Sequence, residues 1–458
     1  MNVSRWPTRG TALLAIAAAI AACSRLAPPS VAATTSPTTP INPVVNCNVT
    51  NQDAPVTAKL LSSGVPCEAM VTKPFDKLDH VQAGFDSYSW LTFLGLNAPA
   101  DGSGPIGSPP TPGGDAPAVW ESWKELSDVM LPDGATPLPW DAPRAVPAAC
   151  RGLGGGKVLR MVGKTPTLLE DTNQPFDTGP LIDQNGNYVR YEILINRPMF
   201  EFIVQNRLYS KAGQAAFTGK IAFPQGAVTG KTSGTMGAFT IKAAWKVLGP
   251  SDNRAGFHTT EALVYTPAVP QAKVAESCVK GSLGLVGLHV AHKTGGAPQW
   301  IWSTFEHRAN VPVAGDLAGS HYNFNNPACA GACPVNQPPP RPWNPNVQPF
   351  PKGFTSQITR FAAITREVMQ LNGQYQGLLT GTVWKNYQLV STQWPSDPGS
   401  ATDPNGVPAP TFLANTTMET YIQGRIPQAS SSCMACHGNA AATSARTADF
   451  TYVLERAK

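Results

Sequence analysis

Two cysteines and a histidine near the end of the chain have the spacing Cys-x-x-Cys-His, at Cys433, Cys436 and His437. This spacing is the attachment sequence for a c-type haem. Thiols three residues apart lie on one helical turn, where they can reach the two vinyl groups of one porphyrin. The histidine that follows is then the proximal ligand of the iron. The motif predicts one covalent haem c as cofactor, held through thioethers at Cys433 and Cys436, with His437 as the iron ligand.

Two other kinds of site use closely spaced cysteines. A thioredoxin-like dithiol needs no histidine and follows a strand in a βαβ unit. A structural zinc site needs a second pair of ligands, and no Cys or His pair follows the motif within metal-ligand spacing. Haem attachment is therefore the preferred interpretation.

The first residues have the features of an export signal. Arg5 and Arg9 precede an apolar stretch, 13–20, that is too short to cross a bilayer as a helix. The tetrapeptide Ile-Ala-Ala-Cys that ends at Cys23 resembles the lipobox of bacterial lipoproteins, in which the cysteine is lipidated and becomes the first residue. We expect a lipoprotein signal peptide over 1–22 and a lipid anchor at Cys23. The serine after this cysteine favours the outer membrane in that family, with the protein facing the periplasm.

The rest of the chain divides into a tether and a body. Residues 23–45 are rich in Pro and Thr and are predicted to be an unpacked tether. The globular haem-bearing body then spans 46–458, with its haem segment at 411–458. The net charge of +5 over 458 residues gives no basic patch of the kind that binds nucleic acid. We expect the partners to be a membrane, through the lipid anchor, and a redox protein that the sequence does not identify.

Nine cysteines occur in all, and three of them are assigned above. An even number remains, which an oxidising compartment would convert into three disulfides. Cys329 and Cys333 form the best local pair, whereas the connectivity of the other four stays open. Those four are Cys47, Cys67, Cys150 and Cys278.

Hydrophobic periodicity predicts a strand-rich middle with helices around it. The expected strands are 188–195, after an Asn185-Gly186 turn, and 239–247, 262–265, 283–290, 300–307 and 382–390. The expected helices are 84–96, 200–208 and 358–371. Another is expected from about 115, with Trp120, Trp123 and Met130 on its buried side. A last one starts with a capping box at Thr416 and Glu419 and ends before Pro427. A Pro-rich loop is expected over 325–351.

Three of the seven histidines, His289, His292 and His307, fall on two adjacent predicted strands. His289 and His292 would point to opposite faces of their strand, so at most one of the two reaches a given site. The strands are rich in Trp and small apolar residues, which suits the cover of a porphyrin. These histidines are therefore the candidate distal residues of the iron. His289 is favoured because Gly287 beside it permits close approach.

Several short stretches resemble those of a widespread set of uncharacterised bacterial cytochrome c family proteins, exported lipoproteins with a single Cys-x-x-Cys-His near the C-terminus. They are Ser89-Trp90-Leu91-Thr92-Phe93, Val119-Trp120-Glu121-Ser122-Trp123-Lys124, Lys242-Ala243-Ala244-Trp245-Lys246, Gly287-Leu288-His289 and Trp300-Ile301-Trp302-Ser303-Thr304-Phe305-Glu306. The resemblance spans most of 75–440 and implies no particular activity.

Only 21 residues follow His437, and none is Met, so a small cytochrome domain cannot be built after the motif. The upstream body must then cover the haem. We predict an α+β fold with an antiparallel, strand-rich core, peripheral helices and the C-terminal haem segment docked on that core. The expected function is electron transfer by a lipid-anchored monohaem c-type cytochrome. A haem enzyme of the peroxidase or oxygenase kind, or a haem-based ligand sensor with an open distal site, is the alternative, because the body is larger than electron transfer requires.

The lipobox resemblance gives a first prediction. The change Cys23→Ser removes the thiol that would carry lipid, so the variant should incorporate no labelled fatty acid and should keep its signal peptide. Metabolic labelling and cell fractionation check this. Wild-type protein found unlabelled and wholly in the soluble periplasmic fraction would contradict the anchor.

Overall fold

The computed structural model describes residues 43, 45–47, 56–69, 78–108, 116–154, 156–160, 178–230, 233–268, 275–313, 321–329, 331–344, 347, 349–350, 354–424, 431–443 and 446–458. All of them belong to one compact unit, Thr35–Lys458. The predicted signal peptide, Cys23 and nearly all of the tether lie outside the described residues. Among the described helices, none has both the length and the apolar character needed to cross a membrane.

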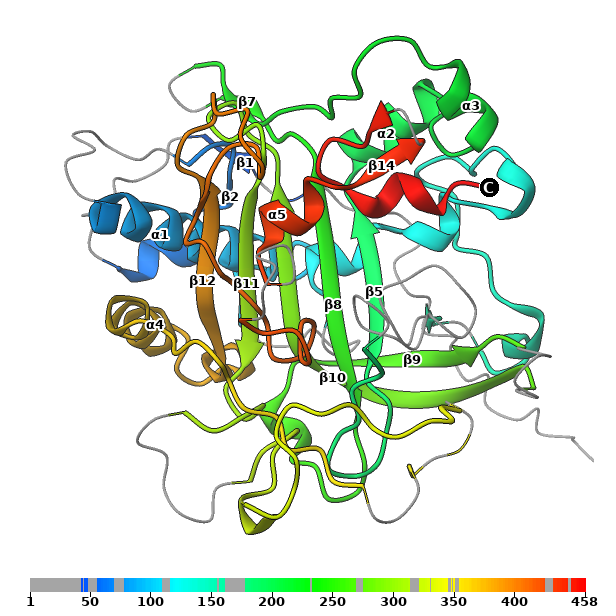
Figure 1. Cartoon of the computed structure of the whole chain (residues 1–458), viewed down its shortest axis with the longest axis vertical. Helices are drawn as coiled ribbons and strands as arrows, with labels where there is room; N and C mark the ends of the chain where they lie inside the picture. The colour runs from blue at the N-terminus through cyan, green and yellow to red at the C-terminus, as the bar shows by residue number, and fades with distance from the viewer. Residues whose placement is uncertain are drawn as a thin grey trace, which may run out of the picture. The chain divides into compact units, whose positions relative to one another are not determined.

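A nine-stranded sheet forms the centre of this unit (Figure 1). Its main path runs β13 (Pro408–Ala409), β12 (Tyr387–Pro395), β11 (Ile301–His307), β10 (Ser277–His292), β8 (Phe239–Val247), β5 (Arg190–Ile195) and β3 (Lys124–Glu125). All of these pairs are antiparallel. The first half of β10 pairs instead with β9 (Thr259–Thr266), whose other neighbour is the parallel strand β4 (Lys157–Leu159). Short two-stranded sheets are β1–β2 (Val45–Asn46 and Val65–Pro66), β6–β7 (Ala227–Val228 and Gly234–Thr235) and β14–β15 (Ala441–Thr443 and Arg446–Thr447).

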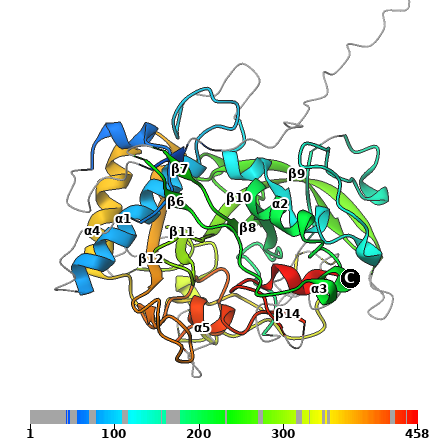
Figure 2. The same cartoon turned by 90° about the horizontal axis from the view of Figure 1, so that it is seen from above.

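The two faces of the central sheet carry different elements. Helices α1 (Leu78–Leu96) and α4 (Arg366–Leu378) lie on one side, and the short helix α5 (Cys433–His437) lies on the other (Figure 2). Alternation along the strands explains the α1 side: Ile241, Ala243 and Trp245 of β8 are buried in the main core with Trp90 of α1. The remaining helices are α2 (Arg197–Gln205) and α3 (Lys211–Ala216).

The α+β fold class predicted from the sequence is therefore confirmed. The strand at 239–247 is found with the same bounds, and the predicted strands at 188–195, 262–265, 283–290 and 300–307 each overlap an observed one. The helix predicted at 84–96 ends at the same residue as α1, and the one at 200–208 overlaps α2. The strand predicted at 382–390 begins only at Tyr387, because Thr382 caps a 3-10 turn, Val383–Asn386.

The helix predicted from about 115 is wrong. The described residues there form a 3-10 turn at Val119–Ser122, the strand β3 and a second 3-10 turn at Leu126–Asp128. Trp120 and Trp123 are fully buried, as expected. Because the two tryptophans are three residues apart, a 3-10 turn buries both as well as an α-helix would.

Two predicted helix starts are also wrong. Helix α4 begins at Arg366 rather than near 358, since the side chain of Thr365 caps its first turn by accepting from the backbone N–H of Val368 (3.3 Å). Residues 415–424 form successive turns and no α-helix. In a capping box the backbone N–H of Thr416 would donate to Glu419, but it donates instead to the carboxylate of Glu306 (2.6 Å).

Three disulfides join six of the described cysteines. They are Cys47–Cys67, Cys150–Cys278 and the local pair Cys329–Cys333 that the sequence indicated. The longest loop is closed by Cys150–Cys278, whose partners are 128 residues apart in the sequence. This bond ties the 3-10 turn Ala148–Cys150 to the start of β10.

The three bonds should differ in their effect on stability. The loop-entropy relation gives about 5 kcal/mol for closing a loop of that length and about 2 kcal/mol for a loop of a few residues. We expect Cys150→Ala with Cys278→Ala to lower the free energy of unfolding more than Cys329→Ala with Cys333→Ala does. Denaturant unfolding of both double variants measures this. Equal losses would show that the disulfide joining β10 to the 3-10 turn does not act through loop closure.

Candidate functional site

Helix α5 consists of the five residues of the Cys-x-x-Cys-His motif. At about 100° per residue, Cys433, Cys436 and His437 share an arc of about 100° of the helix surface. Met434 and Ala435 lie on the opposite side and are buried in the core or against it. The helix therefore turns its apolar side chains towards the protein and presents the three residues of the motif together.

A glutamine of the sheet anchors the start of α5. The side-chain oxygen Oε1 of Gln393, on β12, accepts from the backbone N–H of Met434 (2.8 Å) and from the hydroxyl of Ser432 (3.3 Å). The same hydroxyl of Ser432 accepts from the backbone N–H of Ala435 (3.3 Å). Since the first N–H groups of a helix have no partner within it, these bonds account for two of them and fix where the motif begins.

The imidazole of His437 is oriented by the chain that follows it. Its Nδ1 lies 2.9 Å from the backbone carbonyl of Phe450. A carbonyl only accepts, so Nδ1 carries the proton and Nε2 carries the lone pair that could bind a metal. The rings of Trp302 and Tyr452 pack on the imidazole, with centroids 4.4 and 5.1 Å away. The hydroxyl of Tyr452 also donates to the carbonyl of Cys436 (2.7 Å).

These residues fit a c-type haem in three respects. Cys433 and Cys436 take no part in the three disulfides and are half-buried, so their sulfurs are placed at the surface of the body. Their spacing on one helical turn is that of the two porphyrin vinyl groups. His437 has the tautomer and the carbonyl partner that metal-binding histidines usually have. In the described part of the chain, no group of three or more His, Cys, Asp or Glu side chains is arranged to hold a metal ion.

His289 lies on the face of the sheet that carries α5. In the strand register, Trp302 is paired with Ala291 of β10 on one side and with Gln393 of β12 on the other. His289 is two residues from Ala291, so its side chain emerges on the same face. It is half-buried, and its Nε2 lies 3.3 Å from a carboxylate oxygen of Glu419.

The close approach that Gly287 permits is made by the neighbouring segment. A Cβ atom at Gly287 would lie 2.1 Å from the hydroxyl of Thr417 and 3.3 Å from the side-chain oxygen of Asn415. Glycine is therefore required there so that residues 415–418 can pack on the sheet. Gly287 thus makes room for residues 415–418 and gives no reason to favour His289. The position of His289 on the α5 face follows from the strand register.

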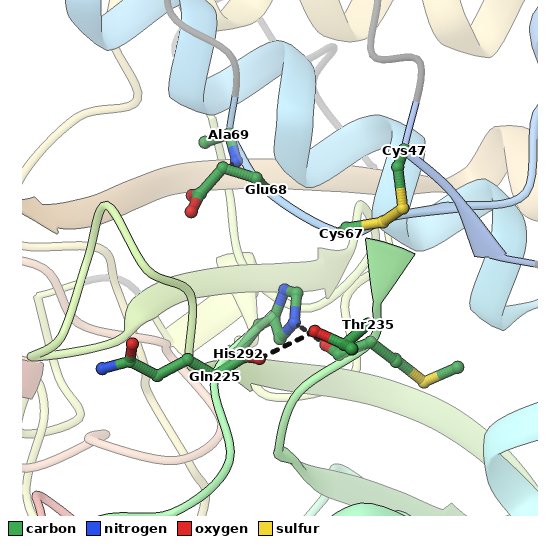
Figure 3. The surroundings of a disulfide bond; sticks show 8 residues. Cys47, Cys67, Glu68, Ala69, Gln225, Thr235 and His292 are labelled. Atoms are coloured by element: carbon green, nitrogen blue, oxygen red, sulfur yellow. Dashed lines mark hydrogen bonds between the residues drawn. A yellow bond between two sulfur atoms is a disulfide. The ribbon is translucent and has the colours of Figure 1, made fainter. Parts of the chain in front are cut away.

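His292 is part of the core on the α1 side, near the Cys47–Cys67 disulfide (Figure 3). Its Nδ1 is bonded to the hydroxyl of Tyr88, and its Nε2 to the carbonyl of Met236. Burial lowers the pKa of His292 to about 3, against the opposing effect of the bond to that carbonyl. Both ring nitrogens are thus engaged in the fold, and the imidazole is neutral at pH 7.

His307 is engaged in a similar way at the end of β11. Its Nε2 donates to the carbonyl of Gly256 (2.9 Å), and its Nδ1 accepts from the backbone N–H of Ala309 (3.2 Å). The ring stacks on Phe257, with centroids 4.3 Å apart. Burial lowers the pKa of His307 to about 4. Of the three histidines singled out in the sequence, His289 is the one that the structure brings to the face of α5.

Sequence reasoning missed most of the surroundings of the motif. The Phe450 carbonyl leaves no trace in the sequence, because every residue has one. Gln393 lies just beyond the strand predicted at 382–390, and only its place opposite Trp302 in β12 reveals its role. Trp302 was part of a stretch singled out for a haem pocket, and this is the one signal that pointed to the contact.

Comparison of the chain with protein-family models, with curated proteins and with solved structures finds no match.

Proposed function

We propose that this protein is a monohaem c-type cytochrome that binds haem covalently and transfers electrons. The observation that carries the proposal is the arrangement at α5: two half-buried cysteines outside the disulfides, followed by a histidine whose Nδ1 donates to the Phe450 carbonyl. A carbonyl at this distance fixes both the tautomer and the direction of the imidazole before any metal is bound.

The attachment chemistry needs only reduced thiols. Each sulfur of Cys433 and Cys436 would form a C–S bond to a vinyl carbon, with the thiol hydrogen going to the other vinyl carbon. When bound, the haem supplies an iron that changes between two oxidation states. His437 would bind that iron through Nε2, and its bond from Nδ1 to the Phe450 carbonyl would raise the basicity of the ligand. The rings of Trp302 and Tyr452 pack on this imidazole and cover part of it.

Exposure of the motif supports electron transfer. Cys433 and Cys436 are half-buried rather than enclosed, so a haem edge attached to them would lie near the surface, within reach of a redox partner. Export through the signal peptide at 1–22 and anchoring through Cys23 would place this edge in the periplasm, beside a bacterial membrane, which the lipobox resemblance implies is the outer one.

One observation favours a second function, that of a haem enzyme or ligand sensor. His289 and Glu419 lie 3.3 Å apart on the α5 face of the sheet. A histidine beside a carboxylate can donate or accept a proton near a bound ligand. This pair would suit an open sixth position on the iron, at which a small molecule such as a peroxide or a gas could bind.

Haem attachment is the first test of the proposal. The double change Cys433→Ser with Cys436→Ser removes both thiols, so haem staining of the protein on a denaturing gel should be abolished. The matched control is Cys329→Ser with Cys333→Ser, which also removes a closely spaced pair of sulfurs and should retain full staining. Staining that persists in the first variant would refute covalent attachment at this motif.

The three histidines should differ in their effects on the haem-loaded protein. His289→Ala should change the spin state or the carbon monoxide spectrum, because this side chain lies on the face of α5. His292→Ala and His307→Ala should leave both unchanged and lower the free energy of unfolding by about 2–4 kcal/mol, since each loses buried contacts and hydrogen bonds. Absorption spectra and denaturant unfolding of the three variants measure this. A spectrum unaffected by His289→Ala would remove it from the distal side.

A further inference from the structure

The two residues that carry the proximal carbonyl have an unusual backbone. Asp449 and Phe450 are consecutive and both have positive φ, at 52° and 62°. Residues other than glycine are rarely left-handed, and a bulky residue such as phenylalanine least of all. Two such residues in a row are strained and persist only where the surroundings hold them.

A buried ion pair holds this backbone. The carboxylate of Asp449 is paired with the ammonium of Lys293, and both side chains are almost fully buried, at 5% and 3% exposed. The same carboxylate oxygen accepts from the backbone N–H of Phe223 (2.7 Å), and the carbonyl of Asp449 accepts from the indole of Trp300 (3.0 Å). Phe223 and the connection between β10 and β11, which carries Lys293 and Trp300, are both far from Asp449 in the sequence and together fix this residue.

The residue fixed in this way lies directly before the partner of His437. The carboxylate of Asp449 binds Lys293 and Phe223, so Asp449 acts on the imidazole of His437 through the backbone. It determines the plane of the peptide that follows, and the carbonyl of Phe450 reaches Nδ1 of His437 at 2.9 Å from the left-handed conformation. If Asp449 were released, the strained pair could relax, and the carbonyl would turn away from the histidine.

We propose that the buried Asp449–Lys293 pair is a positioning device for His437, which sets the reduction potential of the iron by holding the Phe450 carbonyl against Nδ1. This inference rests on the proposed function, because the potential is that of the proposed haem. A strong bond from Nδ1 to a carbonyl makes the imidazole a better electron donor, which favours the oxidised iron and lowers the potential. Asp449 and Lys293 are thus positioning residues that act through the backbone.

The test is the change Asp449→Asn in the full-length, haem-loaded protein. Asparagine has the shape of aspartate and can still accept from Phe223, but it cannot neutralise Lys293. We expect the midpoint potential, measured by spectroelectrochemical titration, to shift upward while covalent haem staining is retained. The control is Asp183→Asn, which removes one of the two carboxylates beside another buried lysine, Lys246, whose second partner is Asp252; the side chains of Asp183 and Lys246 are 0% and 3% exposed.

A second variant guards against the cost of leaving a buried lysine unpaired. Asp449→Asn with Lys293→Met removes both charges and decides the question if the single variant does not accumulate. Its potential should also lie above that of the wild type. A wild-type potential in haem-loaded Asp449 variants, or an equal shift in Asp183→Asn, would overturn the positioning role. Wild-type protein without covalent haem would instead refute the proposed function, so the two failures are distinguishable.

Discussion

Glu306, near the end of β11, is a fully buried acidic side chain whose partners organise one face of the sheet. A buried carboxylate is costly unless it is paired and hydrogen-bonded. Glu306 is bound by Arg360 (2.6 Å) and by the backbone N–H and hydroxyl of Thr416 (2.6 and 2.7 Å). One side chain thus joins the strand to the stretch before α4 and to the segment that leads to α5. The face that carries the motif is assembled around this requirement.

The path from Glu306 to the motif is short in space. Asn415, the residue before Thr416, donates to the hydroxyl of Thr304 (2.9 Å). Thr304 is two residues before Glu306 on β11 and is paired with His289 in the register. The backbone N–H of Leu413 donates to the carbonyl of Ser431 (2.8 Å), so the residues just before α5 lie beside those just before Asn415. Gln393 then binds the first turn of the helix. The position of the motif follows from polar groups of the sheet that need partners, more than from contacts of its own apolar residues.

This dependence explains what the sequence could and could not predict. The strand at 239–247 was found because alternation along a half-covered strand is a local pattern. The motif was found because its chemistry requires a fixed spacing. The helix predicted from Thr416 was wrong because the capping box is also a local pattern. Glu306, which accepts from the backbone N–H and the hydroxyl of Thr416, is 110 residues away in the sequence. The Phe450 carbonyl could not be predicted at all, since its direction depends on backbone torsions.

Phe450 is close to His437 in the sequence, but the groups that aim its carbonyl are remote. Lys293 and Phe223, the partners of Asp449, are 156 and 226 positions away from it. Contacts at such separations form late in folding, because the intervening chain must first be closed into loops. A helix of five residues is marginal on its own in water, so α5 and the direction of the Phe450 carbonyl both depend on contacts with remote parts of the chain. The surroundings of His437 are therefore complete only when the sheet has closed, and the orientation of this one imidazole reports on the folding of the whole unit.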